Sequence, residues 1–177
     1  MSLFVFGYGS LMWRPGFPYT SRQLATVRGR HRRLCVYSWV HRGTQERPGL
    51  VLGLDRGGAC RGVVFEVAEA DRDGVVSYLR EREQVTFVYQ ERQMPARLED
   101  GSTVEALTYV VDRAHPQYAG ALSVEETLAV VRGAVGQSGK NEDYVLSTAD
   151  HLDSAGVADP RLSVIAGHLR AGQAAQP

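Results

Sequence analysis

The sequence has little cysteine, no excess charge of either sign and no long hydrophobic run. Only two of the 177 residues are cysteine, Cys35 and Cys60. They lie too far apart for a metal knuckle or a redox pair, and so few cysteines exclude a disulfide framework. We interpret both as small structural side chains in a protein of the reducing cytosol.

The balance of charge excludes some partners. Lysine plus arginine and aspartate plus glutamate both number 20, so the formal net charge is zero. A neutral chain does not attract nucleic acid or an anionic membrane over long range, and we expect neither as a partner. The apolar run at Leu3–Phe6 has no basic leader and is too short for a secretory core or a membrane span. We therefore expect a cytoplasmic protein, and no feature indicates an oligomeric state.

Alternating apolar and polar residues dominate the first two thirds of the chain, as in half-buried strands. We expect strands at residues 3–7, 32–39, 50–55, 60–67, 85–97 and 103–111. A helix is expected at about 71–81, with Val75, Val76 and Leu79 on its apolar face.

Helical spacing replaces alternation after Asp112. Ser123 and Glu126 form a capping box at the start of one helix, Gly156 suits the end of a second, and Pro160 suits the start of a third. We expect one α+β domain over residues 1–170, a small, mostly antiparallel, barrel-like sheet with helices packed against it. Residues 171–177 are expected to form a flexible tail.

The stretch LFVFGYGSLMW, Leu3–Trp13, ends an apolar strand at two glycines that flank Tyr8. It is not a dinucleotide fingerprint, because G-x-G-x-x-G needs glycine at the position of Met12. It is not a nucleophile elbow, because Ser10 is not framed as G-x-S-x-G. Two interpretations remain: an ordinary glycine turn, or a turn whose backbone N–H groups bind a carboxylate or a developing oxyanion.

Charges alternate at the end of the mid-chain helix, in YLREREQ, Tyr78–Gln84. Such a pattern is usually a solvated helix face. In a second interpretation, the apolar residues that follow withdraw one glutamate from water and raise its pKa from about 4.3 toward neutrality. A carboxylate of that kind is suited to proton transfer.

Two further stretches carry polar groups. Val36–Thr44 places His41 and Arg42 beside aromatic residues, where His41 either binds an anion or is structural. The five histidines show no ligand spacing and no Cys/His cluster, so we expect no metal. The basic run RGRHRR, Arg28–Arg33, comes without an RNA-binding aromatic motif, and we expect an exposed edge there.

Five short motifs occur together in one order. They are Tyr8–Leu11 (YGSL), Pro48–Leu54 (PGLVLGL), Cys60–Val63 (CRGV), Leu79–Glu83 (LRERE, as L-x-x-R-E) and Gly139–Tyr144 (GKNEDY). Together they resemble the ChaC-like branch of the γ-glutamylcyclotransferases, the glutathione-specific enzymes, over residues 3–165.

The resemblance implies a barrel-like α+β fold and a cofactor-free lyase that releases 5-oxoproline and cysteinylglycine from glutathione. The substrate's own α-amine attacks its γ-carbonyl, so the enzyme supplies no nucleophile. By the same resemblance, the four residues of the turn hold the glutamyl end of the substrate, and Glu83 moves the proton. The residues of the turn are Tyr8, Gly9, Ser10 and Leu11.

Some choices stay open. Glu81 takes the role of Glu83 if the motif is shifted, and Tyr144 either contacts the glutamyl group or is a core tyrosine. His41 and Arg42 are expected to face the glycyl end of glutathione. The alternatives in function are a cyclotransferase for other γ-glutamyl amino acids or γ-glutamylamines, and a non-catalytic module that binds γ-glutamyl compounds.

Overall fold

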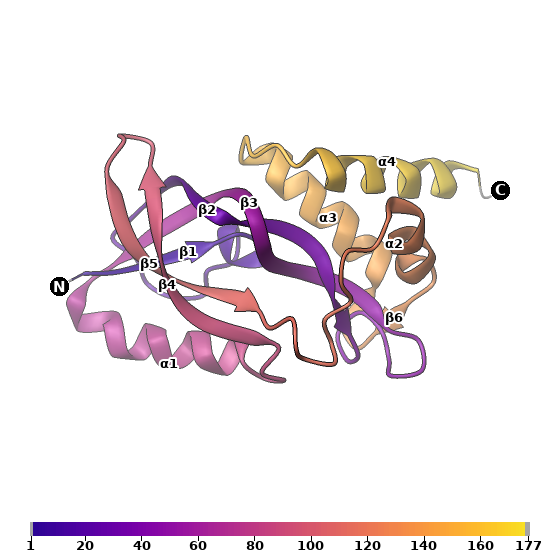
Figure 1. Cartoon of the computed structure of the whole chain (residues 1–177), viewed down its shortest axis with the longest axis horizontal. Coiled ribbons are helices and arrows are strands. Elements are labelled where there is room, and N and C mark those ends of the chain that lie inside the picture. Colours follow the sequence, from indigo (N-terminus) through magenta and orange to yellow (C-terminus); the bar gives the residue numbers. More distant parts are fainter. Residues whose placement is uncertain (1, 176–177) are drawn as a thin grey trace. The chain divides into compact units, whose positions relative to one another are not determined.

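Five strands form a closed barrel in the computed structural model, which describes residues 2–175 (Figure 1). Their order around the barrel is β1, β3, β2, β4, β5. The strands are β1 (Leu3–Gly7), β2 (Ser21–Ser38), β3 (Gly49–Val67), β4 (Tyr89–Leu98) and β5 (Thr103–Val111). The pairs β1–β3, β2–β4 and β4–β5 are antiparallel, and β1–β5 is parallel. The expected α+β fold with a mostly antiparallel, barrel-like sheet is confirmed.

The chain is divided into two compact units, each built from two separate stretches. The first contains the residues up to Arg32 and Gly53–His115, and the second contains Arg33–Leu52 and the residues from Pro116 onward. The strands β2 and β3 continue from one unit into the other without a break.

Helix α1 (Arg72–Glu83) covers the first unit's strands β4 and β5, with the short turns η1 (Ser10–Met12) and η2 (Glu69–Asp71) completing this unit (Figure 1). Val75 and Leu79 are buried, as expected from their spacing, and Val76 is half-buried. Because these side chains fix the rotation of the helix, its last turn brings Glu83 to the sheet.

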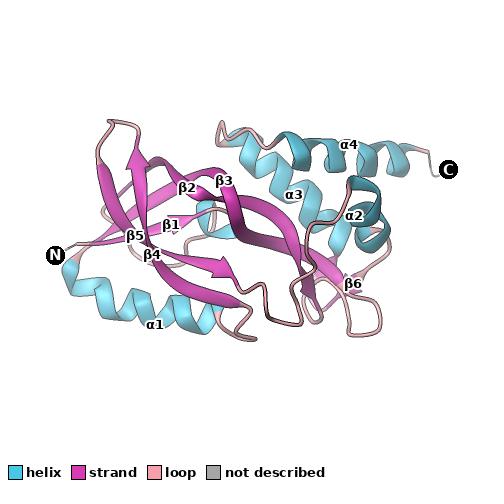
Figure 2. Cartoon of the chain, in the orientation of Figure 1, coloured by secondary structure: helices cyan, strands magenta, loops and turns pink. Residues whose placement is uncertain are grey.

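The second unit contains the other helices, α2 (Val124–Val131), α3 (Asn141–Ser154) and α4 (Pro160–Ala174), and the small hairpin β6 (Val135–Gly136) and β7 (Gly139–Lys140) (Figure 2). The capping box forms as expected: Glu126 donates its backbone N–H to Ser123 Oγ at 3.1 Å, and Ser123 N–H donates to Glu126 Oε2 at 2.7 Å. Pro160 opens α4. No helix within residues 2–175 has the length and apolar character to cross a membrane.

Several expected boundaries are wrong. The tail expected to be flexible from residue 171 is helical to Ala174, in keeping with its alanine and glutamine content, and residues 176 and 177 lie outside the described part. The strand expected at 85–97 begins at Tyr89, because Phe87 has a φ of 58° and the chain turns there. The strands expected at 50–55 and 60–67 are one strand, β3.

Candidate functional site

The turn after β1 depends on close approach of the backbone to itself. A Cβ atom on Gly7 would lie 2.9 Å from Leu11 Cβ, so the chain can fold back into η1 only with glycine at that position. Met12 N–H donates to the Gly9 carbonyl at 2.9 Å and closes the turn. The N–H groups of Ser10 and Leu11 lie at the start of η1, where backbone N–H groups have no acceptor within the helix.

A buried arginine holds the same turn from behind. Arg32, on β2, donates from Nε to the carbonyl of Tyr8 and from a terminal nitrogen to the carbonyl of Arg61 at 2.7 Å. Arg28 is exposed, as expected for the run Arg28–Arg33, but the run is not an edge, because β2 lies between β3 and β4, and Arg32 is buried. No local sequence pattern points to Arg32, because its guanidinium reaches backbone carbonyls of residues far away in the chain.

Glu83 ends α1 in an environment largely removed from water. Its side chain is 18% exposed, and burial raises the pKa of its carboxyl above the ordinary value. The Arg82 guanidinium, with Nε 3.4 Å from Glu83 Oε1, opposes this rise without cancelling it. Glu81, the other candidate, is exposed to solvent. The geometry therefore favours Glu83 as the proton carrier.

Arg82 connects the end of α1 to the turn after β1. One terminal nitrogen donates to Ser10 Oγ at 2.9 Å. The other donates to the Arg14 carbonyl at 2.7 Å and to the Tyr78 hydroxyl at 3.0 Å. The turn and the helix end that carries Glu83 are thus brought together by one side chain. The sequence pattern includes Arg82 as the arginine of L-x-x-R-E, but nothing in the pattern assigns it this function.

A second carboxylate, Glu91, acts on the same tyrosine as Glu83 and has the opposite electrostatic environment. Arg80 donates to both oxygens of Glu91 at 2.8 Å and holds the pKa of that carboxyl below its usual value. Tyr109 donates its hydroxyl to Glu91 Oε2 at 3.1 Å. Burial, followed by the charge of Glu91, raises the pKa of Tyr109 well above its ordinary value, and Glu83 adds to the rise. Two carboxyls that act on one tyrosine thus have pKa values shifted in opposite directions, which is a feature of acid–base sites.

The remaining candidate residues belong to the second unit. The Arg42 guanidinium lies 5.5 Å from the ring centre of Tyr144, and the Tyr144 hydroxyl accepts the Leu52 N–H at 3.1 Å. His41 is exposed, and its Nδ1 is 2.9 Å from Ser138 Oγ. Arg42 and Tyr144 are therefore neighbours, as a shared substrate contact would require. Within residues 2–175, no three side chains of His, Cys, Asp or Glu are grouped so that they could hold a metal ion.

Comparison with known proteins decides the family. A model of the ChaC-like protein family matches residues 3–171. The chain belongs to the ChaC-like family. Among relatives of this family member, the glutathione-specific γ-glutamylcyclotransferase of Escherichia coli (strain K12) is 32% identical over 161 residues, which cover 91% of this chain and 70% of that protein. Glutathione-specific γ-glutamylcyclotransferase 1 of Homo sapiens is 33% identical over 159 residues, with 88% and 72% covered.

A solved structure agrees with the barrel of this ChaC-like chain. The crystal structure of a γ-glutamyl cyclotransferase specific to glutathione from yeast matches with a TM-score of 0.85 at 22% identity, and the match covers 96% of each chain. At that identity the likeness concerns the fold. The family resemblance and the fold expected from the five motifs are both confirmed.

Proposed function

We propose that this ChaC-like protein is a γ-glutamylcyclotransferase that cleaves glutathione to 5-oxoproline and cysteinylglycine. The observation that carries the proposal is the position of Glu83, a carboxyl withdrawn from water with a raised pKa at a helix end that Arg82 ties to the turn after β1. Relatives that carry this activity in their names, at 32% and 33% identity, support it.

The chemistry requires no group on the enzyme that forms a covalent bond. The α-amine of the glutamyl residue attacks its own γ-carbonyl carbon, a five-membered ring forms, and the bond from that carbon to the cysteine nitrogen breaks. The free amine has a pKa near 8, so at neutral pH it must lose a proton before it attacks. The attacking nitrogen loses two protons in all, one to become a neutral amine and one as the ring amide forms, and the departing cysteine nitrogen gains two to leave as an ammonium. Glu83 carries one proton from the attacking nitrogen to the departing one, and the other proton is exchanged through solvent.

The turn Tyr8–Leu11 would hold the glutamyl end in the conformer that cyclises. Its backbone N–H groups suit the α-carboxylate or the oxyanion that develops on the γ-carbonyl. Fixing an intramolecular attack in this way is worth up to about 7–11 kcal/mol in favourable cases. Tyr144 is proposed to contact the glutamyl group, and His41 and Arg42 are proposed to face the cysteinylglycine part.

We place this reaction in the cytoplasm, where glutathione keeps thiols reduced. Cys35 and Cys60 are both buried as thiols, which supports a reducing compartment.

The test is to incubate the pure protein separately with glutathione and with γ-glutamyl-alanine and to measure 5-oxoproline. We expect product from glutathione and much less from γ-glutamyl-alanine. Product from γ-glutamyl-alanine alone would move the activity to other γ-glutamyl amino acids. Tight binding of glutathione without product would identify a binding module.

A further inference from the structure

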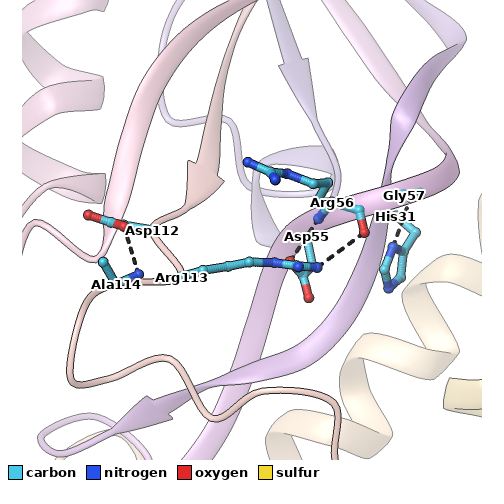
Figure 3. Close-up of polar contacts among 7 residues, drawn as sticks. All are labelled: His31, Asp55, Arg56, Gly57, Asp112, Arg113 and Ala114. Carbon is cyan, nitrogen blue, oxygen red and sulfur yellow. Dashed lines mark hydrogen bonds and ion pairs between the residues drawn. The ribbon is translucent and has the colours of Figure 1, made fainter.

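One buried carboxylate and four arginines interact electrostatically in the first unit, and the candidate site described above uses none of them. Asp55, on β3, is 1% exposed. It accepts two hydrogen bonds at 2.7 Å on Oδ1, from Arg113 Nε and from the backbone N–H of Arg56. Figure 3 shows the Arg113 side chain reaching from the segment after β5 to Asp55. We call Arg30, Arg56, Arg92 and Arg113 the arginine cluster.

The single carboxylate does not balance the arginine cluster. The pKa of Arg30, which is half-buried, is lowered by burial first and then by Arg56, Arg92 and Arg113, with only Asp55 acting against them. The terminal nitrogens of Arg92 donate to neutral acceptors, the Glu91 carbonyl and the Gln90 side-chain oxygen. These positive charges repel one another and are partly removed from water. A bound anion would stabilise them.

Sheet topology places the arginine cluster at the same end of the barrel as the turn Tyr8–Leu11. Strands β1 and β5 are parallel, with Val5 opposite Leu107, so the residues that follow the two strands leave the sheet at the same end. The turn follows β1, and Arg113 follows β5. The Asp112 N–H also donates to the Val88 carbonyl at 2.7 Å, which joins this end of β5 to the segment that follows Glu83.

Strand β2 connects the arginine cluster to the candidate site. Arg32, which holds the carbonyl of Tyr8, is two residues from Arg30, and side chains at this spacing share a face of a strand. Arg92 is on β4, the antiparallel neighbour of β2. The exposed guanidinium groups of Arg56, Arg92 and Arg113 leave the cluster open to a ligand from solvent.

We propose that the arginine cluster binds the carboxylate at the far end of a γ-glutamyl peptide, the glycyl carboxylate when the peptide is glutathione. This inference rests on the proposed function, assigns the glycyl carboxylate to the arginine cluster in place of Arg42, and adds a reason for peptide specificity. Guanidinium groups bind carboxylates through paired, charge-assisted hydrogen bonds. A γ-glutamylamine has no such carboxylate and gains nothing from the cluster.

The experiment compares glutathione with its glycyl monoethyl ester, which lacks only that charge. Binding is measured by calorimetry on the Glu83→Gln protein, and 5-oxoproline formation is measured on the protein with Glu83 intact. We expect the ester to bind roughly 10- to 100-fold more weakly and to show a matching fall in kcat/KM. In Arg92→Gln and Arg30→Gln proteins, the difference between the two ligands should shrink to within about threefold, because glutathione loses affinity and the ester does not.

Arg97→Gln is the matched control, since Arg97 is an exposed arginine on the same strand as Arg92 and lies outside the cluster. The Arg113→Lys variant keeps a cation beside Asp55. If glutathione and its ester bind this variant with similar affinity, unfolding around Asp55 is not the cause. Thermal melts of each variant check this directly.

The outcomes separate the two proposals. Equal binding of glutathione and ester, or a contrast that persists in Arg30→Gln and Arg92→Gln, overturns the carboxylate site even if 5-oxoproline is formed. If Arg42→Gln abolishes the difference in affinity between glutathione and its ester while the cluster variants keep it, the glycyl carboxylate binds Arg42. That result also overturns the carboxylate site in the cluster. A contrast that depends on the cluster, without any 5-oxoproline, supports the site and refutes the proposed function.

Discussion

Glu83 and Glu81 differ by two positions on one helix and offer a direct comparison of a half-buried carboxyl with an exposed one. We expect Glu83→Gln to reduce turnover of glutathione by a factor of about 10² to 10⁴, the usual contribution of a general base. Affinity for glutathione should change by less than tenfold, because glutamine keeps the shape of the side chain. Glu81→Gln serves as the control and should keep wild-type turnover in a 5-oxoproline assay. The opposite result would transfer the proton chemistry to Glu81.

The raised pKa of Glu83 also makes stability depend on pH. A carboxyl with a folded-state pKa above its unfolded value of about 4.3 stabilises the fold while protonated, and this contribution is lost as pH rises through the folded-state pKa. Glutamine is neutral at every pH and is not subject to this loss. Glu83→Gln should therefore melt at the same temperature as the wild type near pH 4 and at a higher temperature near pH 7.5.

Differential scanning calorimetry across this range measures the difference, with Glu81→Gln as the exposed reference. A wild type that is the more stable protein at pH 7.5 would mean that the ion pair with Arg82 outweighs desolvation at Glu83.

The sequence identifies some of these residues and leaves others hidden. The turn Tyr8–Leu11 and Glu83 are found because they lie in short contiguous motifs. Arg32 and Arg113 are not found, because their long side chains reach Tyr8 and Asp55 across strands, and no local pattern records such a contact. The roles of all these residues in catalysis remain predictions.

At the level of elements, the site depends on how firmly the end of α1 is attached to the turn after β1. Arg82 makes that attachment through hydrogen bonds to Ser10, Arg14 and Tyr78. A lysine keeps the charge and loses the fork of donors that reaches these acceptors. We expect Arg82→Lys to lower kcat for glutathione roughly 10- to 100-fold, because both the turn and Glu83 lose their mutual position.

The matched control for Arg82 is Arg72→Lys, at the exposed first position of the same helix, which should leave kcat unchanged. A role limited to folding would lower the melting temperature of Arg82→Lys while leaving the kcat of the folded fraction intact. That pattern in steady-state kinetics and thermal melts would contradict a positioning role.

Short strands with regular alternation were predictable, and long or irregular ones were not. The bounds of β1 and β5 agree with expectation, since each is a brief apolar or alternating run. The first half of β2 is missed because its residues are mostly polar and several are exposed. Strand β3 appears divided because Gly57 and Gly58 are typical of a turn, yet both adopt positive φ within one continuous strand. Val85 and Phe87 alternate as in a strand but are 72% and 71% exposed.

For the whole molecule, a net charge of zero hides strong local separation of charge. The arginine cluster and the half-buried Glu83 lie in one unit, although the chain as a whole has equal numbers of acidic and basic residues. A neutral molecule gives weak long-range steering, so recognition of a charged peptide must come from local groups. Composition discourages a nucleic-acid interpretation, but it cannot reveal such a cluster, because the arginines come from distant parts of the chain.

The division into two compact units raises the question of whether they unfold together. Strands β2 and β3 run through both units, so neither can lose its part of these strands without disturbing backbone that continues into the other. We therefore expect a single cooperative transition, as in one domain.

The two tryptophans provide separate probes, because Trp13 is in the first unit and Trp39 is in the second. Urea unfolding of Trp13→Phe and Trp39→Phe, followed by fluorescence, reports on one unit at a time. Each protein is also followed by circular dichroism, which corrects for any change in its own stability. We expect the fluorescence and circular dichroism midpoints to coincide in each variant, whereas a fluorescence midpoint that departs from the circular dichroism midpoint in either would identify two independently unfolding domains.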